Sequence, residues 1–221
     1  MGIVLGFNIF INFKTYPQGT GVNAIELTKI CEQVSEEKDI EIIPIVQVVD
    51  LYRVKQAVKI PIWVQHVDQA LPDKNTGFVT LDSVIETGAS GTLLNHSEHP
   101  LPPGTVKQIL ARARNKNFKT IVAAKTLGQL ERLVKLKPNY IAYEIADLIG
   151  GKVSITEANP KAIVNAVKIA GNTPVIVGAG VNKAEDLVAA RKLGAVGVLV
   201  SSAVVLAENP KEILLELLRL I

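Results

Sequence analysis

The stretch KTIVAAKTLGQLERLVKLKPNYIAYE, residues 119–144, contains one complete unit of the pattern that decides the fold. Two short apolar runs, 119–124 and 139–144, enclose an amphipathic run at 126–137. Continuous apolar runs of this length are typical of strands buried on both faces, and the run between them has the periodicity of a helix. The stretch therefore predicts a strand–helix–strand unit with parallel strands.

The same alternation runs along the whole chain. The strand candidates are residues 7–12, 40–46, 60–65, 91–95, 119–124, 139–144, 173–178 and 195–200. Helical patterns lie between them, for example at residues 21–36, 81–88, 102–117, 126–137, 159–171, 182–194 and 209–220. Eight strand–helix units in 221 residues give about 28 residues each, which suits short connecting loops. Since no linker or composition break divides the chain, we predict a single α/β domain over residues 1–221, a closed (β/α)8 TIM barrel rather than an open sheet.

Composition narrows the possible partners. Hydrophobic residues make up 48% of the chain and aromatic residues 5%, so the core must be aliphatic. The net charge is only +3, and the basic residues are scattered rather than gathered in a stripe, so no nucleic acid partner is expected. The single cysteine, Cys31, cannot form an internal disulfide, which fits a cytoplasmic protein with a packed thiol. Residues 1–14 lack the cationic segment of a secretory signal and are too short to span a bilayer, so no membrane partner is expected.

The active site of such a barrel lies at the C-terminal ends of the strands, so the residues there are the site candidates. The first predicted strand ends at Asn12, and Lys14 follows two positions later, so both side chains point to one face if the strand continues. A lysine over the barrel mouth is costly unless it meets an anion. A solvated lysine just beyond the strand would give the same sequence pattern.

Two histidines follow the fourth predicted strand. His96 leaves the strand directly and could act as an acid or an electrophile near neutral pH, or simply be a polar residue at a strand end. His99 lies three positions later, which raises the question of a metal. The spacing offers no clear third ligand, so we expect neither a metal nor a cofactor.

The sixth predicted strand ends at Glu144. A carboxylate at a partly desolvated strand end has a raised pKa and can serve as a general base. The following segment contains Gly150 and Gly151, which would allow a loop to close over the acid and exclude water. The alternative is a surface acid followed by an ordinary glycine turn.

Small residues follow the seventh and eighth predicted strands. Gly178, Gly180, Ser201 and Ser202 would let a ligand approach backbone N–H groups closely, and this position in a barrel often binds phosphate. Lys125, at the end of the fifth predicted strand, could instead form a Schiff base as in barrel aldolases, or be a loop lysine.

The motifs NFKTY, NHSE, AYE followed by LIGG, VGAGV and LVSSAVV occur in this order at predicted strand ends. Together they resemble the triosephosphate isomerase family, specifically its short archaeal form, over essentially the whole chain. The resemblance implies the interconversion of dihydroxyacetone phosphate and D-glyceraldehyde 3-phosphate through an enediolate, in glycolysis and gluconeogenesis. It also implies no cofactor.

The resemblance implies a role for each site residue. Glu144 would be the base and His96 the electrophile; this family is itself the established example of a glutamate base with a neutral histidine and a closing loop. Asn12 and Lys14 would bind substrate, and Glu98 would hold Lys14 by a charge-assisted hydrogen bond. Backbone N–H groups for the phosphate would come from Ile149, Gly150, Gly151, Gly180, Ser201 and Ser202.

The resemblance also implies an assembly. The segment QHVDQALPDKNTGFVT, residues 65–80, matches the family's protruding loop, and Thr76 would reach into a neighbouring subunit. A homodimer or a homotetramer is therefore expected.

Two departures bear on the loop after Glu144. Ile145 stands where many members have proline, which would loosen the first hinge, and IGGK is one residue shorter than the usual IGTGK. Two other functions stay open on this pattern, a Schiff-base aldolase using Lys125 or Lys14 and a non-catalytic phosphate binder.

Overall fold

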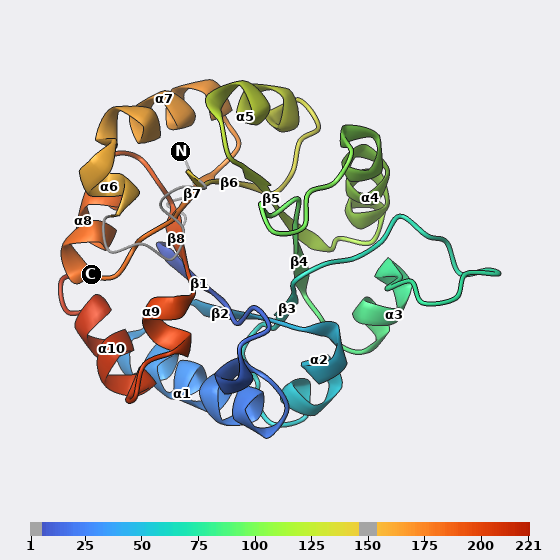
Figure 1. Cartoon of the computed structure of the whole chain (residues 1–221), viewed down its shortest axis with the longest axis horizontal. Coiled ribbons are helices and arrows are strands. Elements are labelled where there is room, and N and C mark those ends of the chain that lie inside the picture. The colour runs from blue at the N-terminus through green and yellow to red at the C-terminus, as the bar shows by residue number, and fades with distance from the viewer. Residues whose placement is uncertain (1–5, 146–153) are drawn as a thin grey trace.

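The computed structural model describes residues 6–145 and 154–221. Its strands are all parallel and close into a barrel in sequence order, with helices around the outside (Figure 1). They are β1 (Asn8–Asn12), β2 (Ile42–Val46), β3 (Trp63–Val64), β4 (Gly91–Leu94), β5 (Lys119–Ala124), β6 (Tyr140–Tyr143), β7 (Val175–Gly178) and β8 (Gly197–Val200). Each strand lies within its predicted range, and the predicted closed (β/α)8 barrel is confirmed.

The helices of the described residues follow the strands in the expected alternation. They are a 3₁₀ helix η1 (Pro17–Gly19), α1 (Val22–Lys38), α2 (Val48–Lys55), α3 (Leu81–Glu86), α4 (Pro103–Asn115), α5 (Leu127–Val134), α6 (Ile155–Ala158), α7 (Pro160–Ala170), α8 (Ala184–Lys192), α9 (Ser202–Val205) and α10 (Pro210–Leu217). Helix α2, like the short helices η1, α6 and α9, has no counterpart among the predicted ranges. Its exposed face carries Val48, Val49 and Tyr52, and these apolar residues blur the amphipathic pattern.

The buried side chains along each strand alternate strictly between two hydrophobic cores, one inside the barrel and one between the barrel and the helices. On β1, Ile9 and Ile11 pack outward against the helices, whereas Phe10 points into the barrel. The ring of Phe10 meets that of Trp63 at a centroid distance of 5.2 Å, so side chains fill the barrel interior. Close packing extends to Gly91, where a Cβ atom would lie 2.3 Å from the Trp63 ring.

The same alternation places polar side chains at the barrel mouth. On β1, β6 and β8 the last interior apolar residues are Phe10, Ala142 and Leu199. Two positions later on each strand path stand, respectively, Asn12, Glu144 and Ser201. Because the side-chain period of a strand is two, these three residues form the next layer above the packed interior.

Between β3 and α3 the chain leaves the barrel as an extension, which we call the arm (residues 69–79; Figure 1). Its base is closed by Asp68, which donates its backbone N–H to Val79 O at 2.8 Å and accepts the Val79 N–H on Oδ2 at 2.7 Å. Arg112 on α4 donates to the carbonyl oxygens of Gln69 and Ala70. In the described residues no helix is long and apolar enough to cross a membrane.

Candidate active site

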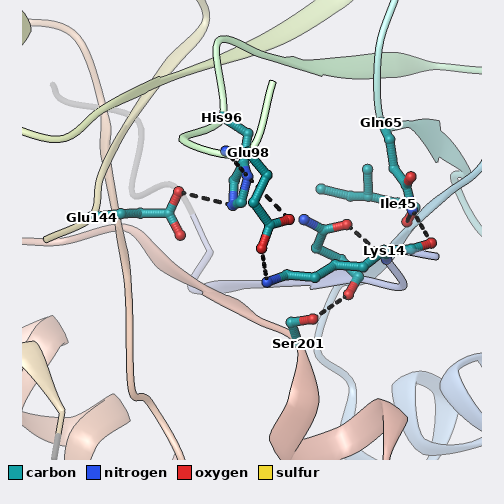
Figure 2. Close-up of polar contacts among 8 residues, drawn as sticks. Lys14, Ile45, Gln65, His96, Glu98, Glu144 and Ser201 are labelled. Atoms are coloured by element: carbon teal, nitrogen blue, oxygen red, sulfur yellow. Dashed lines mark hydrogen bonds and ion pairs between the residues drawn. The ribbon is translucent and has the colours of Figure 1, made fainter. Parts of the chain in front are cut away.

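The turn after β1 fixes Asn12 and Lys14 by hydrogen bonds. Asn12 Oδ1 accepts the Lys14 backbone N–H at 3.0 Å, and Asn12 O accepts the Ser201 hydroxyl at 2.7 Å. Lys14 has a φ of 49°, which is uncommon for a residue other than glycine. Its carbonyl oxygen accepts a hydrogen bond from Gln65 Nε2 at 2.8 Å (Figure 2). Gln65, which was not among the candidates, therefore helps to hold a strained turn at the barrel mouth.

The Lys14 ammonium forms an ion pair across the mouth. Its Nζ lies 2.6 Å from Glu98 Oε1, and the Lys14 side chain is 13% exposed against 56% for Glu98. The second oxygen of Glu98, Oε2, lies 3.6 Å from His96 Nδ1. The cation is thus held at the inner side of the pair, close to the histidine (Figure 2).

His96 is positioned by a turn that begins at Asn95. Asn95 is buried with a φ of 58°; its Nδ2 donates to Ala123 O and its Oδ1 accepts the Leu101 N–H. His96 Nδ1 accepts the Glu98 backbone N–H at 3.2 Å, which assigns the hydrogen of a neutral ring to Nε2. Burial lowers the pKa of His96, assisted by the charge of Lys14 and opposed by that of Glu98. The neutral imidazole therefore presents a donor to the barrel axis.

Glu144, which follows β6, points toward that donor (Figure 2). Its Oε2 lies 3.6 Å from His96 Nε2, which is too long for a hydrogen bond. Among the described residues, Glu144 Oε2 is the one buried side-chain polar atom that lacks a hydrogen-bond partner. Burial raises the pKa of Glu144 to about 7, with Lys14 lowering it and Glu98 raising it. A buried carboxyl that titrates near neutral pH and has a free oxygen can accept a proton from a ligand.

These side chains line one cavity of about 220 Å³. Its walls are Asn12, Lys14, His96 and Glu144 together with residues 179–182 and 199–203, so Gly180, Ser201 and Ser202 also line it. The three remaining candidates for phosphate binding, Ile149, Gly150 and Gly151, lie outside the described residues.

A family model described as triosephosphate isomerase matches residues 7–219 of the chain. The chain belongs to the triosephosphate isomerase family. It is 38% identical over 217 residues to the triosephosphate isomerase of Methanocaldococcus jannaschii, covering 96% of this chain and 99% of that protein. For the triosephosphate isomerase of Methanosarcina barkeri the identity is 39% over 217 residues, covering 96% and 98%. For that of Methanobrevibacter smithii it is 33% over 213 residues, covering 95% and 96%. The predicted membership is confirmed, and it makes the chain an isomerase.

A second cavity, of about 470 Å³, adjoins the first at the mouth of this triosephosphate isomerase family barrel. It shares Asn12, Lys14 and His96 with the first, and all three histidines of the chain line it. The rings of His66 and His99 lie 4.2 Å apart, and His66 Nε2 is 3.1 Å from Asp68 Oδ1. The described part of the chain has no group of three or more His, Cys, Asp or Glu side chains that could hold a metal ion.

The other lysine candidate lies away from these two cavities. Lys125 is exposed and borders a separate space of about 30 Å³ with Ser97 and Glu144. Lys14 lines both main cavities but is held in its ion pair with Glu98 as a cation, whereas Schiff-base formation needs a neutral amine. Neither geometry favours the aldolase alternative. Thr76 is exposed on the arm.

Gly178 leaves the space that Glu144 occupies. A Cβ atom at Gly178 would lie 2.5 Å from Glu144 Oε1 and 2.8 Å from its Cγ, so the carboxylate would have to move. If Glu144 reacts with the substrate, Gly178→Ala should lower kcat by roughly 10²-fold, the effect of misplacing a reacting group by about an ångström. The measurement is kcat in the triose phosphate assay. Gly128→Ala is the matched control, because its Cβ would meet nothing within 4 Å, and equal losses in both variants would refute the argument.

Proposed function

We propose that this chain interconverts dihydroxyacetone phosphate and D-glyceraldehyde 3-phosphate through an enediolate, in the cytoplasm, as a step of glycolysis and gluconeogenesis. The substrate is inferred from the activity for which the relatives are named, triosephosphate isomerase. One observation supports the mechanism above all others. A buried carboxylate with a raised pKa and an unpartnered oxygen faces a neutral imidazole and a lysine cation in one cavity.

Glu144 is the proposed base. It takes the proton from the carbon beside the substrate carbonyl; the C–H electron pair forms the C=C bond of the enediolate, and the carbonyl oxygen gains the negative charge. The hydroxyl proton then moves to the charged oxygen, and return of the proton from Glu144 to the former carbonyl carbon completes the isomerisation. A pKa of about 7 suits both directions, because the carboxylate is present near neutral pH and its conjugate acid can still return the proton.

His96, Lys14 and Asn12 are the proposed groups that stabilise the enediolate. His96 Nε2–H would polarise the carbonyl oxygen and shuttle protons between the two substrate oxygens, and a neutral ring suits this role. Lys14 would supply positive charge to the phosphate and the enediolate, with Glu98 fixing its direction. Donors set in place before the reaction need no reorganisation when charge develops.

The phosphate would be held by backbone N–H groups. Gly180, Ser201 and Ser202 are proposed because they line the cavity from the loops after β7 and β8. Ile149, Gly150 and Gly151 are proposed on the family resemblance alone. Small residues at such positions let the backbone approach a ligand closely.

The proposed partner in assembly is a second copy of the chain, as a homodimer or homotetramer. The arm supports this proposal, because it is exposed over residues 71–78, carries Leu71 and Phe78 on its surface, and is held at its base by hydrogen bonds. Thr76 would reach into the neighbouring subunit. Light scattering of the purified chain would measure the assembly, and a monomer at micromolar concentration would contradict it.

The activity is tested with the purified chain in a coupled assay that starts from either triose phosphate. We expect turnover in both directions without added metal or cofactor. Binding of a triose phosphate analogue without turnover would instead identify a non-catalytic binder. Borohydride trapping of a covalent substrate adduct would identify a Schiff-base enzyme.

The pH profile gives a separate prediction. Because kcat/KM reports the free enzyme, it should fall about tenfold per pH unit below about pH 7, where Glu144 becomes protonated. The substrate phosphate itself titrates near pH 6, so its effect is separated by repeating the profile with Glu144→Asp, which changes only the enzyme's limb. A rate that stayed level down to pH 5.5 would exclude Glu144 as a base with a raised pKa.

A further inference from the structure

One buried carboxylate joins two segments that are far apart in the sequence. Asp186 lies in the first turn of α8 and is 2% exposed. Its Oδ1 accepts the Ser154 hydroxyl at 2.5 Å and the Thr156 hydroxyl at 2.6 Å. Its Oδ2 accepts the backbone N–H groups of Asn182 and Lys183 at 3.1 and 3.2 Å. The carboxylate therefore accepts four hydrogen bonds.

Capping of α8 explains only half of this arrangement. An acidic residue in the first helical turn commonly accepts backbone N–H groups, and the bonds to Oδ2 are of this kind. An exposed acid would do the same without the cost of desolvation, whereas burial of a carboxylate is tolerated only when its lone pairs are satisfied. The bonds from Ser154 and Thr156 satisfy Oδ1 and tie α8 to the start of α6.

The loop that Asp186 holds is a wall of the active-site cavity. Residues 179–182 line that cavity, and Ala179 and Gly180 have consecutive positive φ angles of 76° and 70°. Such a conformation costs free energy at Ala179 and must be imposed by its surroundings. A second tie comes from the Ile155 N–H, which donates to Ala179 O at 3.2 Å. The loop is thus fixed from both ends, by α8 and by α6.

We propose that Asp186 is a positioning residue for phosphate binding, acting through the loop of residues 179–183. Its carboxylate locks this loop to Ser154 and Thr156, so that the backbone N–H of Gly180 stays in place for the substrate phosphate. The inference rests on the proposed function and adds a residue that touches neither substrate nor the reacting atoms. Asp186 affects the substrate only indirectly, because it fixes the wall of the cavity that contains Gly180.

The test uses two variants with a matched control. Thr156→Val keeps the shape of the side chain but removes one donor to Oδ1, and Asp186→Asn removes the charge. Glu185→Gln is the control, because Glu185 neighbours Asp186 in the same turn but pairs with Arg219 on the surface. The readouts are KM and kcat for triose phosphate, the inhibition constant of inorganic phosphate, and the turnover of D-glyceraldehyde, which has no phosphate.

We expect KM and the phosphate inhibition constant to rise roughly tenfold in Thr156→Val and more in Asp186→Asn, the range for a lost hydrogen bond to a charged group. D-Glyceraldehyde turnover should stay within about twofold, and Glu185→Gln should match the parent. If Asp186 had a merely structural role, the turnover of both substrates would fall together, or only the melting temperature would fall. Either result would overturn the proposal, and so would an unchanged phosphate inhibition constant in folded Thr156→Val. If Asp186→Asn does not fold, Thr156→Val alone decides the test.

Failure of the proposed function would give a different result. A parent chain without turnover would refute the isomerase activity and leave the role of Asp186 to be decided by calorimetry with inorganic phosphate. Weaker phosphate binding in Thr156→Val than in Glu185→Gln would then still support the positioning role. Equal binding in the two variants would reject it.

Discussion

Replacing Glu144 with glutamine is expected to lower kcat roughly 10³–10⁴-fold, in the upper part of the range for loss of a general base. Glutamine has nearly the shape of the carboxyl group but cannot take a proton from carbon. KM should change little, because the proposed substrate contacts come from Asn12, Lys14 and backbone N–H groups. Steady-state kinetics in both directions measure the effect. A loss below about tenfold would mean that another group is the base.

The control for Glu144→Gln is the free energy of unfolding, which the substitution should change in a defined direction. The pKa of Glu144 is about 7 in the folded chain against an ordinary 4.5, so between these two pH values the unfolded chain loses a proton that the folded chain keeps. The folded state is therefore penalised progressively from pH 4.5 to 7, by about 3 kcal/mol above pH 7. Glutamine removes this penalty, so the variant should unfold at higher denaturant at pH 8 and near the parent's midpoint at pH 4.5.

An inactive variant that is also more stable separates catalysis from folding. Loss of activity through misfolding would lower the denaturation midpoint at every pH. Increased stability confined to high pH would instead identify Glu144 as a buried group that is held ready to ionise. Functional sites are commonly less stable than they could be in this way.

The barrel could be predicted from the sequence because each strand is a short apolar run with its own boundary signals. The run 139–144 is an example: it alternates between the interior and the outer core, and its last residue, Glu144, falls on the interior side. The same period-two argument applies to Asn12 and Ser201. Periodicity therefore predicts which strand-end side chains face the mouth, since it depends only on neighbours along the chain.

Contacts between distant segments leave no such local signal. Asn95 takes a left-handed conformation that prediction by periodicity does not capture, and its side chain donates a hydrogen bond to Ala123 O, 28 positions away. Gln65 supports the Lys14 turn from 51 positions away, and Asp186 reaches Ser154 across 32 positions. The closed barrel fixes these partners, because it brings the loops at the strand ends together. They could be found only after the topology was known.

The loop after Glu144 holds the remaining difference from the family pattern. Ile145, which stands where many members have proline, is partly buried and packs against the outer core. A looser first hinge at this position stays a prediction. The shortened IGGK segment falls outside the described residues. The residues that follow it are anchored, because Ser154 and Thr156 both donate hydrogen bonds to Asp186.

Replacing Lys14 with methionine is expected to lower kcat roughly 10²–10³-fold and to raise KM, because one positive group would serve both the enediolate and the phosphate. Methionine keeps the apolar stem and removes only the charge. The charge also acts on the base, since Lys14 lowers the pKa of Glu144. The acid limb of kcat/KM should therefore move above pH 7 in this variant, which links the lysine to the base rather than to substrate affinity alone.

Two controls isolate the charge at this position. Lys125→Met makes the same chemical change at another strand end, at an exposed lysine that lines neither main cavity, and should leave kcat and KM within about twofold. Glu98→Gln keeps the Lys14 cation but removes the charge that raises the pKa of Glu144, so its acid limb should move to lower pH. Opposite shifts in Lys14→Met and Glu98→Gln would establish that the ion pair tunes the base. No shift in either variant would mean that burial alone sets the pKa of Glu144, and shifts in the same direction would contradict tuning by the two opposite charges.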